Sequence, residues 1–181
     1  FDTLVIDEFE EDQYHLPRHS HTYYEIIYII KGSGIHQLNK NLIPYQAGDL
    51  FVLSTDDEHY FDIQERTRFF FIKFTDTYFN SNKKWSCDEF LLNSPENFMR
   101  DKSLKESVLK LDETCATILK NTIDNIRAYN NKASISTSPI AFYQILSIFG
   151  LIKESLHQQN IKFAVSGIDN DQIISYIHQN I

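Results

Sequence analysis

The sequence predicts a mainly β domain followed by two long helices, and three observations predict it. Up to about residue 76, short runs of β-branched and aromatic residues alternate with turn signals, a pattern typical of a sandwich or barrel. From about residue 101, apolar residues recur every three or four positions, which is the period of an amphipathic helix. The hydrophobic content of 42%, with 14 Phe and 10 Tyr, is enough for an unusually aromatic core.

The amino-terminal half is expected to contain five strands, separated by turns rich in Gly, Asn and Asp. In residues 23–30 and 69–74 both alternating faces are apolar, so both faces of these strands should be covered. The acidic run from Asp7 to Asp12 is expected to be a solvated loop. The expected strands are residues 4–6, 23–30, 35–38, 50–53 and 69–74.

The carboxyl-terminal half supplies the expected cover. Residues 104–126 carry one apolar stripe at helical spacing. A second helix should begin at Ser138, a good N-cap, with Pro139 in its first turn, and should end near Leu156. This helix is apolar in almost every direction, which predicts burial on more than one side: against the barrel, the first helix or a second protomer.

Four side chains form a potential metal-ligand set. His19, His21 and Glu25 share the parity that places strand residues on one face, and His59 returns on a later strand. Three imidazoles and a carboxylate are sufficient ligands for one divalent transition metal. The alternative is a polar interior in which the same side chains hydrogen-bond to each other, to water or to an organic ligand.

Neighbouring residues extend this set to a ligand-binding cavity. Tyr23 and Ile27 share the parity of the ligand set and are expected to line the cavity, with ordinary core packing as the alternative. His15 and His36 lie outside the motif and are expected to be exposed.

The spacing of these residues resembles the two sequence motifs of the cupin superfamily. The first motif is matched in full and the second in part, since Thr55 and Asp56 stand where cupins usually carry a Pro-Gly type turn. Residues 17–34 and 47–53 narrow the resemblance to the amino-terminal sensor domain of AraC-type bacterial transcription regulators. The resemblance implies a cupin-type (jelly-roll) β-barrel. The matching positions are His19, His21, Glu25 and Gly32 in the first motif and Gly48 and His59 in the second.

This resemblance also implies a division of the chain. Residues 1–100 would form the cupin-like sensor domain, residues 101–157 a helical dimerisation segment, and residues 158–181 a linker and the truncated first helix of a DNA-binding domain. A homodimer is expected, because the second helix carries more apolar surface than one small barrel can bury. The expected dimerisation residues are Leu104, Val108, Leu111, Ile118, Phe142, Leu146 and Phe149.

Composition excludes some partners. The formal net charge is −8, with 17 basic residues scattered among 25 acidic ones, so DNA should be bound only through residues beyond 181. Residues 140–152 are too short to span a bilayer, and no signal peptide opens the chain. Cys87 and Cys115, with no CxxC spacing, predict reduced buried thiols in a cytoplasmic protein, with one disulfide as the alternative.

Two functions follow from this pattern. The first is the effector-sensing and dimerisation domain of an AraC-type regulator, which binds a small molecule in the barrel and signals to a downstream helix-turn-helix domain. The alternative is a metal-dependent cupin enzyme, an oxygenase or isomerase of a small organic substrate. The helical appendage favours the regulator, because a stand-alone enzyme has no need of it.

Overall fold

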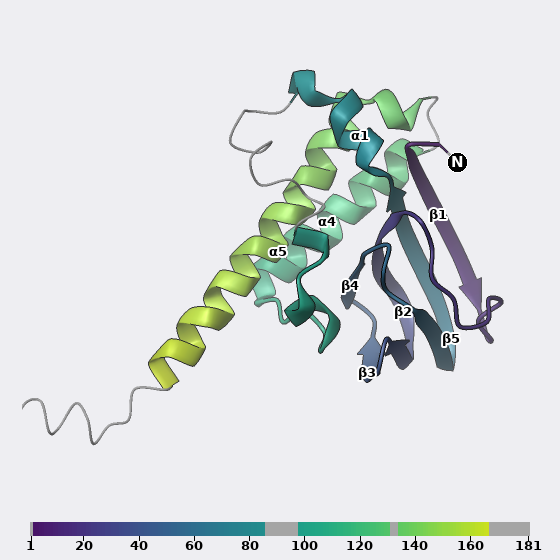
Figure 1. Cartoon of the computed structure of the whole chain (residues 1–181), viewed down its shortest axis with the longest axis vertical. Helices are drawn as coiled ribbons and strands as arrows, with labels where there is room; N and C mark the ends of the chain where they lie inside the picture. Colours follow the sequence, from purple (N-terminus) through teal and green to yellow (C-terminus); the bar gives the residue numbers. More distant parts are fainter. Residues whose placement is uncertain (1, 86–97, 131–133, 167–181) are drawn as a thin grey trace, which may run out of the picture.

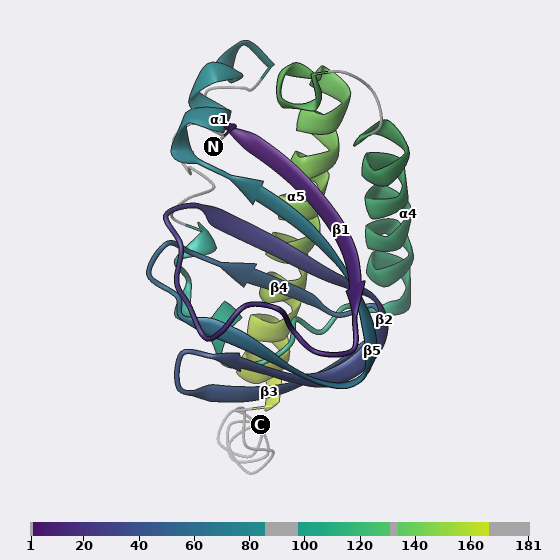
Figure 2. The same ribbon diagram turned by 90° about the vertical axis from the view of Figure 1, so that its right-hand side faces the viewer.

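The computed structural model of the chain describes residues 2–85, 98–130 and 134–166, with side chains up to residue 159. It has two layers: a curved antiparallel sheet, and two long helices that lie along one face of that sheet (Figures 1 and 2). The strands are β1 (Leu4–Glu11), β2 (Tyr24–Leu38), β3 (Asn41–Gln46), β4 (Leu50–Leu53) and β5 (His59–Phe74). The helices are α1 (Asp76–Ser81), α4 (Glu113–Asn130) and α5 (Pro139–Ser166), with short 3₁₀ turns at η1 (Lys83–Trp85), η2 (Lys102–Lys105) and η3 (Ile135–Thr137).

The sheet is organised around two long strands, β2 and β5. Its order is β1-β5-β2-β3, with every pair antiparallel, and β4 pairs with the first half of β2. The strand at residues 41–46, which the sequence analysis did not predict, contains Pro44. It lies at the edge of the sheet, where a residue without a backbone N–H is tolerated.

The faces of β2 and β5 separate two cores, as the two-sided apolar pattern predicted. One is an aromatic interior enclosed by the curved sheet, and the other is a cluster shared with α1, α4 and α5. Along β5, Phe69 and Phe71 face the interior, whereas Phe70, Ile72 and Phe74 face the helices. The interior core consists of Tyr14, Ile27, Ile29, Leu38, Ile43, Tyr45, Phe51, Leu53, Phe61, Phe69 and Phe71.

A bulge in the middle of β2 changes which residues face the interior. The register with β5 shifts between Ile29 and Gly34, and Gly32 has a φ of +95°. Before the bulge the odd-numbered Ile27 and Ile29 point into the interior core, and after it the even-numbered Leu38 does. If side chains are assumed to alternate between the two faces along the whole of β2, without the bulge, residues 34–38 are therefore assigned to the wrong face.

The second helix begins where the sequence predicts. The Ser138 hydroxyl oxygen accepts a hydrogen bond from the Ala141 N–H at 3.3 Å. The helix continues to Ser166, through the first part of the segment predicted as a linker, so its end at Leu156 was wrong. It is also not buried all round, because Ile140 is 50% and Tyr143 52% exposed.

The first apolar stripe is not one helix. Leu104 lies in η2, and the helix α4 begins only at Glu113. No helix in the described residues combines the length and apolarity of a bilayer span. Cys115 is a buried free thiol, as predicted, while Cys87 and the helix expected at residues 168–181 lie outside the described residues.

The acidic run is strand, not loop. Asp7 to Glu11 belong to β1, and the carboxylates there meet basic side chains, so the negative charge of the strand is compensated. The Glu8 carboxylate lies 2.7 Å from Arg68 and 2.8 Å from Arg127, so it joins the sheet to α4. The hydrogen bonds from Arg127 outweigh the effect of burial and lower the pKa of Glu8.

The bulge generates a stability prediction. Gly32 and Gly48 both have a left-handed φ, +95° and +93°, and a side chain in this region costs about 1–2 kcal/mol. A Cβ at Gly32 would also lie 2.5 Å from the Arg66 carbonyl oxygen and 2.6 Å from the Thr67 Cα, whereas a Cβ at Gly48 would have no atom of the described residues within 4 Å apart from its own residue and chain neighbours. Urea unfolding should therefore show a loss of about 1 kcal/mol for Gly48→Ala and about 3 kcal/mol or more for Gly32→Ala. Equal losses would show that the close strand approach at Gly32 does not constrain the fold.

Candidate metal and effector site

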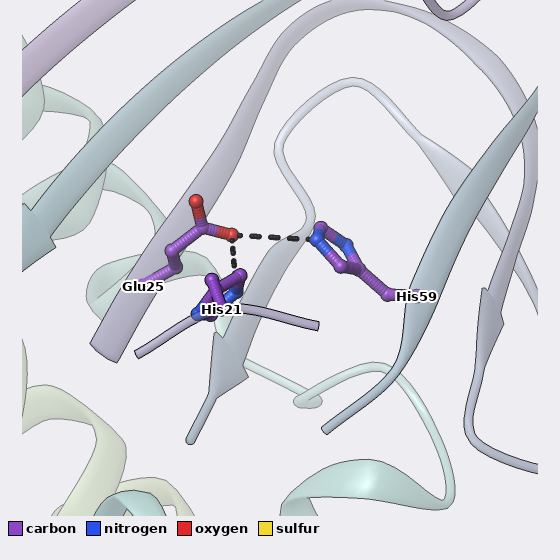
Figure 3. Close-up of side chains that lie close together, drawn as sticks. All are labelled: His21, Glu25 and His59. Atoms are coloured by element: carbon purple, nitrogen blue, oxygen red, sulfur yellow. Dashed lines mark ion pairs between the residues drawn. The ribbon is translucent and has the colours of Figure 1, made fainter. Parts of the chain in front are cut away.

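Three side chains converge at one end of the enclosed interior (Figure 3). His21 lies in the loop before β2, Glu25 near the start of β2, and His59 at the start of β5. The Glu25 Oε2 lies 3.1 Å from the His21 Nε2 and 3.6 Å from the His59 Nε2. These potential ligand atoms all lie within 4.8 Å of one another, and the three residues are at most 9% exposed.

Backbone pairing holds the three residues together. His19 and His59 exchange backbone hydrogen bonds of 3.1 and 2.8 Å, which fixes the loop carrying His21 against β5. Glu25 is opposite Leu53 in the β2–β4 pair, so its side chain projects from the middle of the sheet into the interior. The site is therefore built on regular structure and one clamped loop.

The ring of His21 is oriented by its neighbours. Its Nδ1 lies 2.6 Å from the Tyr23 carbonyl oxygen, a contact that requires the proton on Nδ1. The Tyr23 ring stacks on it with a centroid distance of 4.3 Å and an angle of 7°. The Nε2 of His21 then presents a lone pair toward Glu25. A backbone carbonyl bound to the far nitrogen is the usual support of a metal-ligating histidine.

The residues fit a metal ion. The His21 Nε2, Glu25 Oε2 and His59 Nε2 are buried, and none has a hydrogen-bond partner among the described residues. The 3.1 Å contact between His21 and Glu25 lacks the geometry of a hydrogen bond, and with the proton on Nδ1 it brings two acceptors together. Two imidazoles and a carboxylate are ligands that suit iron, zinc, nickel or manganese.

The remaining predicted site residues surround this group. His19 is partly exposed beside it, with its ring centroid 4.6 Å from that of His59 and its Nδ1 2.9 Å from the Pro17 carbonyl oxygen. It does not belong to the group of converging ligand atoms, and its role as a fourth ligand stays a prediction. Tyr23 is half-buried against His21, and Ile27 is fully buried in the interior core.

A further histidine, His36, joins the site although it was expected to be exposed. It is 0% exposed, and its Nε2 lies 3.3 Å from the His59 Nδ1. Burial, together with the charge of Lys105, lowers the pKa of His36 to about 3, and burial also lowers the pKa of His59 far below its ordinary range. Both imidazoles are therefore neutral at physiological pH. The expectation was wrong because the bulge in β2 turns residue 36 inward, and the glycines at 32 and 34 were the available signal.

The turn that departs from the cupin pattern is tied to the helical half of the chain. Asp57 lies two residues before His59, and its carboxylate is 2.7 Å from the Lys105 Nζ, with both side chains under 9% exposed. Burial alone would raise the pKa of Asp57, but hydrogen bonds from Lys105 and Asn39 lower it. Next to it, Asp56 pairs with Arg100. Sequence reasoning missed these pairs, because they join segments more than 40 residues apart.

The residues expected at a dimer contact lie mostly within the protomer. Phe142 and Phe149 are buried in the core that α5 shares with the sheet, and so is Leu104. Ile118, on α4, is 43% exposed and is free to meet a second copy. The others, Val108, Leu111 and Leu146, are partly buried against the two cores. The dimer assignment stays a prediction that now depends mainly on Ile118.

Comparisons with known proteins agree with this architecture. Residues 4–93 match the family model described as the AraC-like ligand binding domain. The crystal structure of the AraC-like transcriptional activator CuxR is similar over 83% of this chain and 52% of its own, with 12% identity and a TM-score of 0.50, which shows a shared fold. This chain thus spans about half of CuxR.

Cupin structures match a smaller part of the chain. One is a predicted oxalate decarboxylase from Thermotoga maritima, with 20% identity over 39% of this chain and 65% of its own and a TM-score of 0.37. Another is a cupin protein from Bacteroides fragilis, with 21% identity over 42% and 69% and a TM-score of 0.38. None of the curated protein sequences matches the chain significantly.

The converging ligand atoms generate a metal-binding prediction. Protein expressed with iron, zinc, manganese and nickel available should carry close to one equivalent of a divalent metal by elemental analysis. His21→Ala should abolish this content, because a single imidazole and a carboxylate are too few ligands for tight binding. His15→Ala, which removes an exposed imidazole, is the matched control and should leave the content unchanged. Wild-type protein that is metal-free under these conditions would contradict the metal site.

Proposed function

The chain carries an AraC-like ligand-binding domain, a cupin-like β domain followed by helices, and we propose that it is the effector-sensing and dimerising part of an AraC-type transcription regulator. In this proposal a small effector binds at the interior site, in the cytoplasm, and the helices convey its presence to a DNA-binding domain beyond residue 181. The single observation that carries the proposal is the buried group of unpartnered polar atoms in an otherwise aromatic interior.

The chemistry of this group defines what the effector must offer. Glu25 and the Nε2 of His21 present lone pairs, so the group binds a cation or hydrogen-bond donors. Tyr23 and His19 lie at the rim and add an aromatic face and one more polar ring. Convergent polar groups in an aromatic surround are typical of small-molecule sites. We infer that the effector is a metal ion, or a small molecule that binds through one.

The same ligand set supports the second candidate, a metal-dependent cupin enzyme. Two histidines and one carboxylate leave open positions on a metal, which when bound would act as a Lewis acid toward a substrate. The two proposals differ in whether the protein converts a substrate: an enzyme does, and a sensor domain does not. A panel of small oxygen-containing metabolites incubated with metal-loaded protein should be recovered unchanged if the domain is a sensor.

Signalling from the site has a direct structural support. Asp56 and Asp57 precede His59 and are paired with Arg100 and Lys105, which lead into α4 and α5. Lys105 also donates to the Val52 carbonyl oxygen on β4. A ligand that moves His59 therefore displaces a turn to which the helical half is bound. Allostery further requires that the effector bind two arrangements of these parts with different affinity.

A homodimer is the expected state in solution. The exposed Ile118 on α4 is an apolar side chain that a second protomer would bury. Ile118→Asp should shift the protein from dimer to monomer at micromolar concentration, because a carboxylate in an apolar contact without a partner costs several kcal/mol. Light scattering measures the change, and Asn121→Asp, an exposed position one turn along α4, is the control that should stay dimeric. A wild-type protein that is monomeric at high concentration would refute the dimer.

The regulator proposal is tested in the full gene product. A reporter driven by its own promoter target should respond to metals or small metabolites, and Glu25→Gln should reduce that response at least tenfold, because the amide lacks the charge that a cation or donor group needs. Glu106→Gln, which changes an exposed carboxylate, is the matched control. The domain alone should not retard DNA, since its net charge is −8. A gene product without a DNA-binding segment, or a Glu25→Gln protein with a full response, would count against the proposal.

A further inference from the structure

The His36 ring lies between two aromatic rings and contacts the ring of His59. Its ring stacks on Phe61 with a centroid distance of 4.0 Å and an angle of 5°, and it meets the edge of Phe51 at 4.4 Å. The ring therefore has no freedom to turn. Its Nε2 faces the His59 Nδ1 at 3.3 Å, and both residues are 0% exposed.

The contact links the protonation sites of the two rings. A hydrogen bond between two imidazole nitrogens needs one proton, so one nitrogen donates and the other accepts. The other nitrogen of His36, Nδ1, has no partner among the described residues. When His36 donates from Nε2, its Nδ1 carries only a lone pair, and the proton on the His59 Nε2 faces the negative Glu25 carboxylate at 3.6 Å. The reverse donation leaves the His36 Nδ1–H without any acceptor among the described residues, so His36 keeps its proton on Nε2.

This donation sets the tautomer of His59. With Nδ1 as the acceptor, its proton lies on Nε2, which faces the Glu25 carboxylate at 3.6 Å. A metal at the site needs the opposite arrangement, because it binds the Nε2 lone pair. His59 must then carry its proton on Nδ1 and donate it to His36, whose own proton moves to its Nδ1. Each imidazole keeps one proton throughout, and only the positions change.

We propose that His36 is a positioning residue that fixes the ring orientation and tautomer of His59, and so sets how strongly His59 serves as a ligand. This inference rests on the metal site proposed above. A partner on the far nitrogen of a ligating histidine holds the ring and raises its basicity, and such partners are usually carbonyls or carboxylates. Here the partner is a neutral imidazole that can both donate and accept, so the hydrogen bond to His59 is kept with and without a metal, and the metal-bound arrangement leaves the His36 Nδ1–H without an acceptor among the described residues.

Two substitutions of His36 distinguish an effect of its hydrogen bond to His59 from an effect of its packing between aromatic rings. His36→Phe keeps an aromatic ring between Phe51 and Phe61 but removes the hydrogen bond. His36→Gln places an amide within reach of the His59 Nδ1 and can donate or accept. Titration of the metal-free proteins with Zn²⁺ or Ni²⁺ should show 10–100-fold weaker binding for His36→Phe, about the loss known for partners of metal ligands. His36→Gln should stay within about threefold of wild type, because it retains the hydrogen bond.

The tautomer itself can be read without a metal. In histidine-labelled ¹⁵N protein, long-range ¹H–¹⁵N correlation spectra should show His59 protonated on Nε2 in the metal-free state and on Nδ1 after metal is added. In metal-free His36→Phe, the His59 Nδ1 resonance should move toward that of an unbonded nitrogen while the remaining amide spectrum, and hence the fold, is retained.

The outcomes are distinct. Equal metal affinity in His36→Phe and wild type overturns the inference, and so does a His36→Gln protein as weak as His36→Phe, which would assign the effect to packing. A metal-free wild type with the His59 proton on Nδ1 also overturns it. If wild-type protein binds neither metal, the proposed metal site fails, and the metal-free spectra alone decide whether His36 sets the tautomer of His59.

Discussion

The pairing of β2 with β5 is the constraint on which the rest of the molecule depends. Both strands are long, and over residues 24–29 and 69–72 both faces are buried, so that residues directed to the interior alternate with residues directed to the helices. Burial of a large apolar side chain contributes roughly 1.5–3 kcal/mol, so a slip of one residue would expose two cores at once. The register is therefore fixed from both sides. This fixed register holds Glu25 and His59 so that their potential ligand atoms and that of His21, in the loop before β2, lie within 4.8 Å of one another.

Much of this arrangement can be predicted from the sequence. The alternating apolar runs predict both parts of β2, although as two separate strands, together with β4 and the end of β5, and Ser138 with Pro139 marks the start of α5. The spacing of His19, His21 and Glu25, with His59 later, predicts a converging group on strand parity, and the structure brings His21, Glu25 and His59 together although His21 lies in the loop before β2 and His19 beside the group. These features depend on the spacing of apolar residues along the chain and on helix-capping residues, both of which can be identified in a single sequence.

The features that escaped prediction all depend on contacts between distant segments. His36 turns inward only because the strand bulges where Gly32 passes the β5 backbone. The acidic residues of β1 form a strand because Lys73, Arg68 and Arg127 arrive from elsewhere to pair with them. The buried contact of Lys105 with Asp57 is of the same kind. Such a pair is costly to desolvate and adds little net stability, but a charge left without its partner there costs several kcal/mol, so it fixes how the helical half sits on the barrel.

The length of α5 has a mechanical consequence. Its 28 residues extend about 42 Å at roughly 1.5 Å per residue, and only its first part packs on the sheet, while the rest projects beyond the β layer (Figure 1). A rigid rod held along one part of its length amplifies rotation at its free end. The seat against Phe74 and Phe79 is made by Phe149, and Ser166 lies about 26 Å farther along the helix, at roughly 1.5 Å per residue. If this seat turns by about 10°, Ser166 sweeps about 4 Å, so a displacement too small to disturb the tightly packed interior would become a step of nearly one helical turn at the end of the helix.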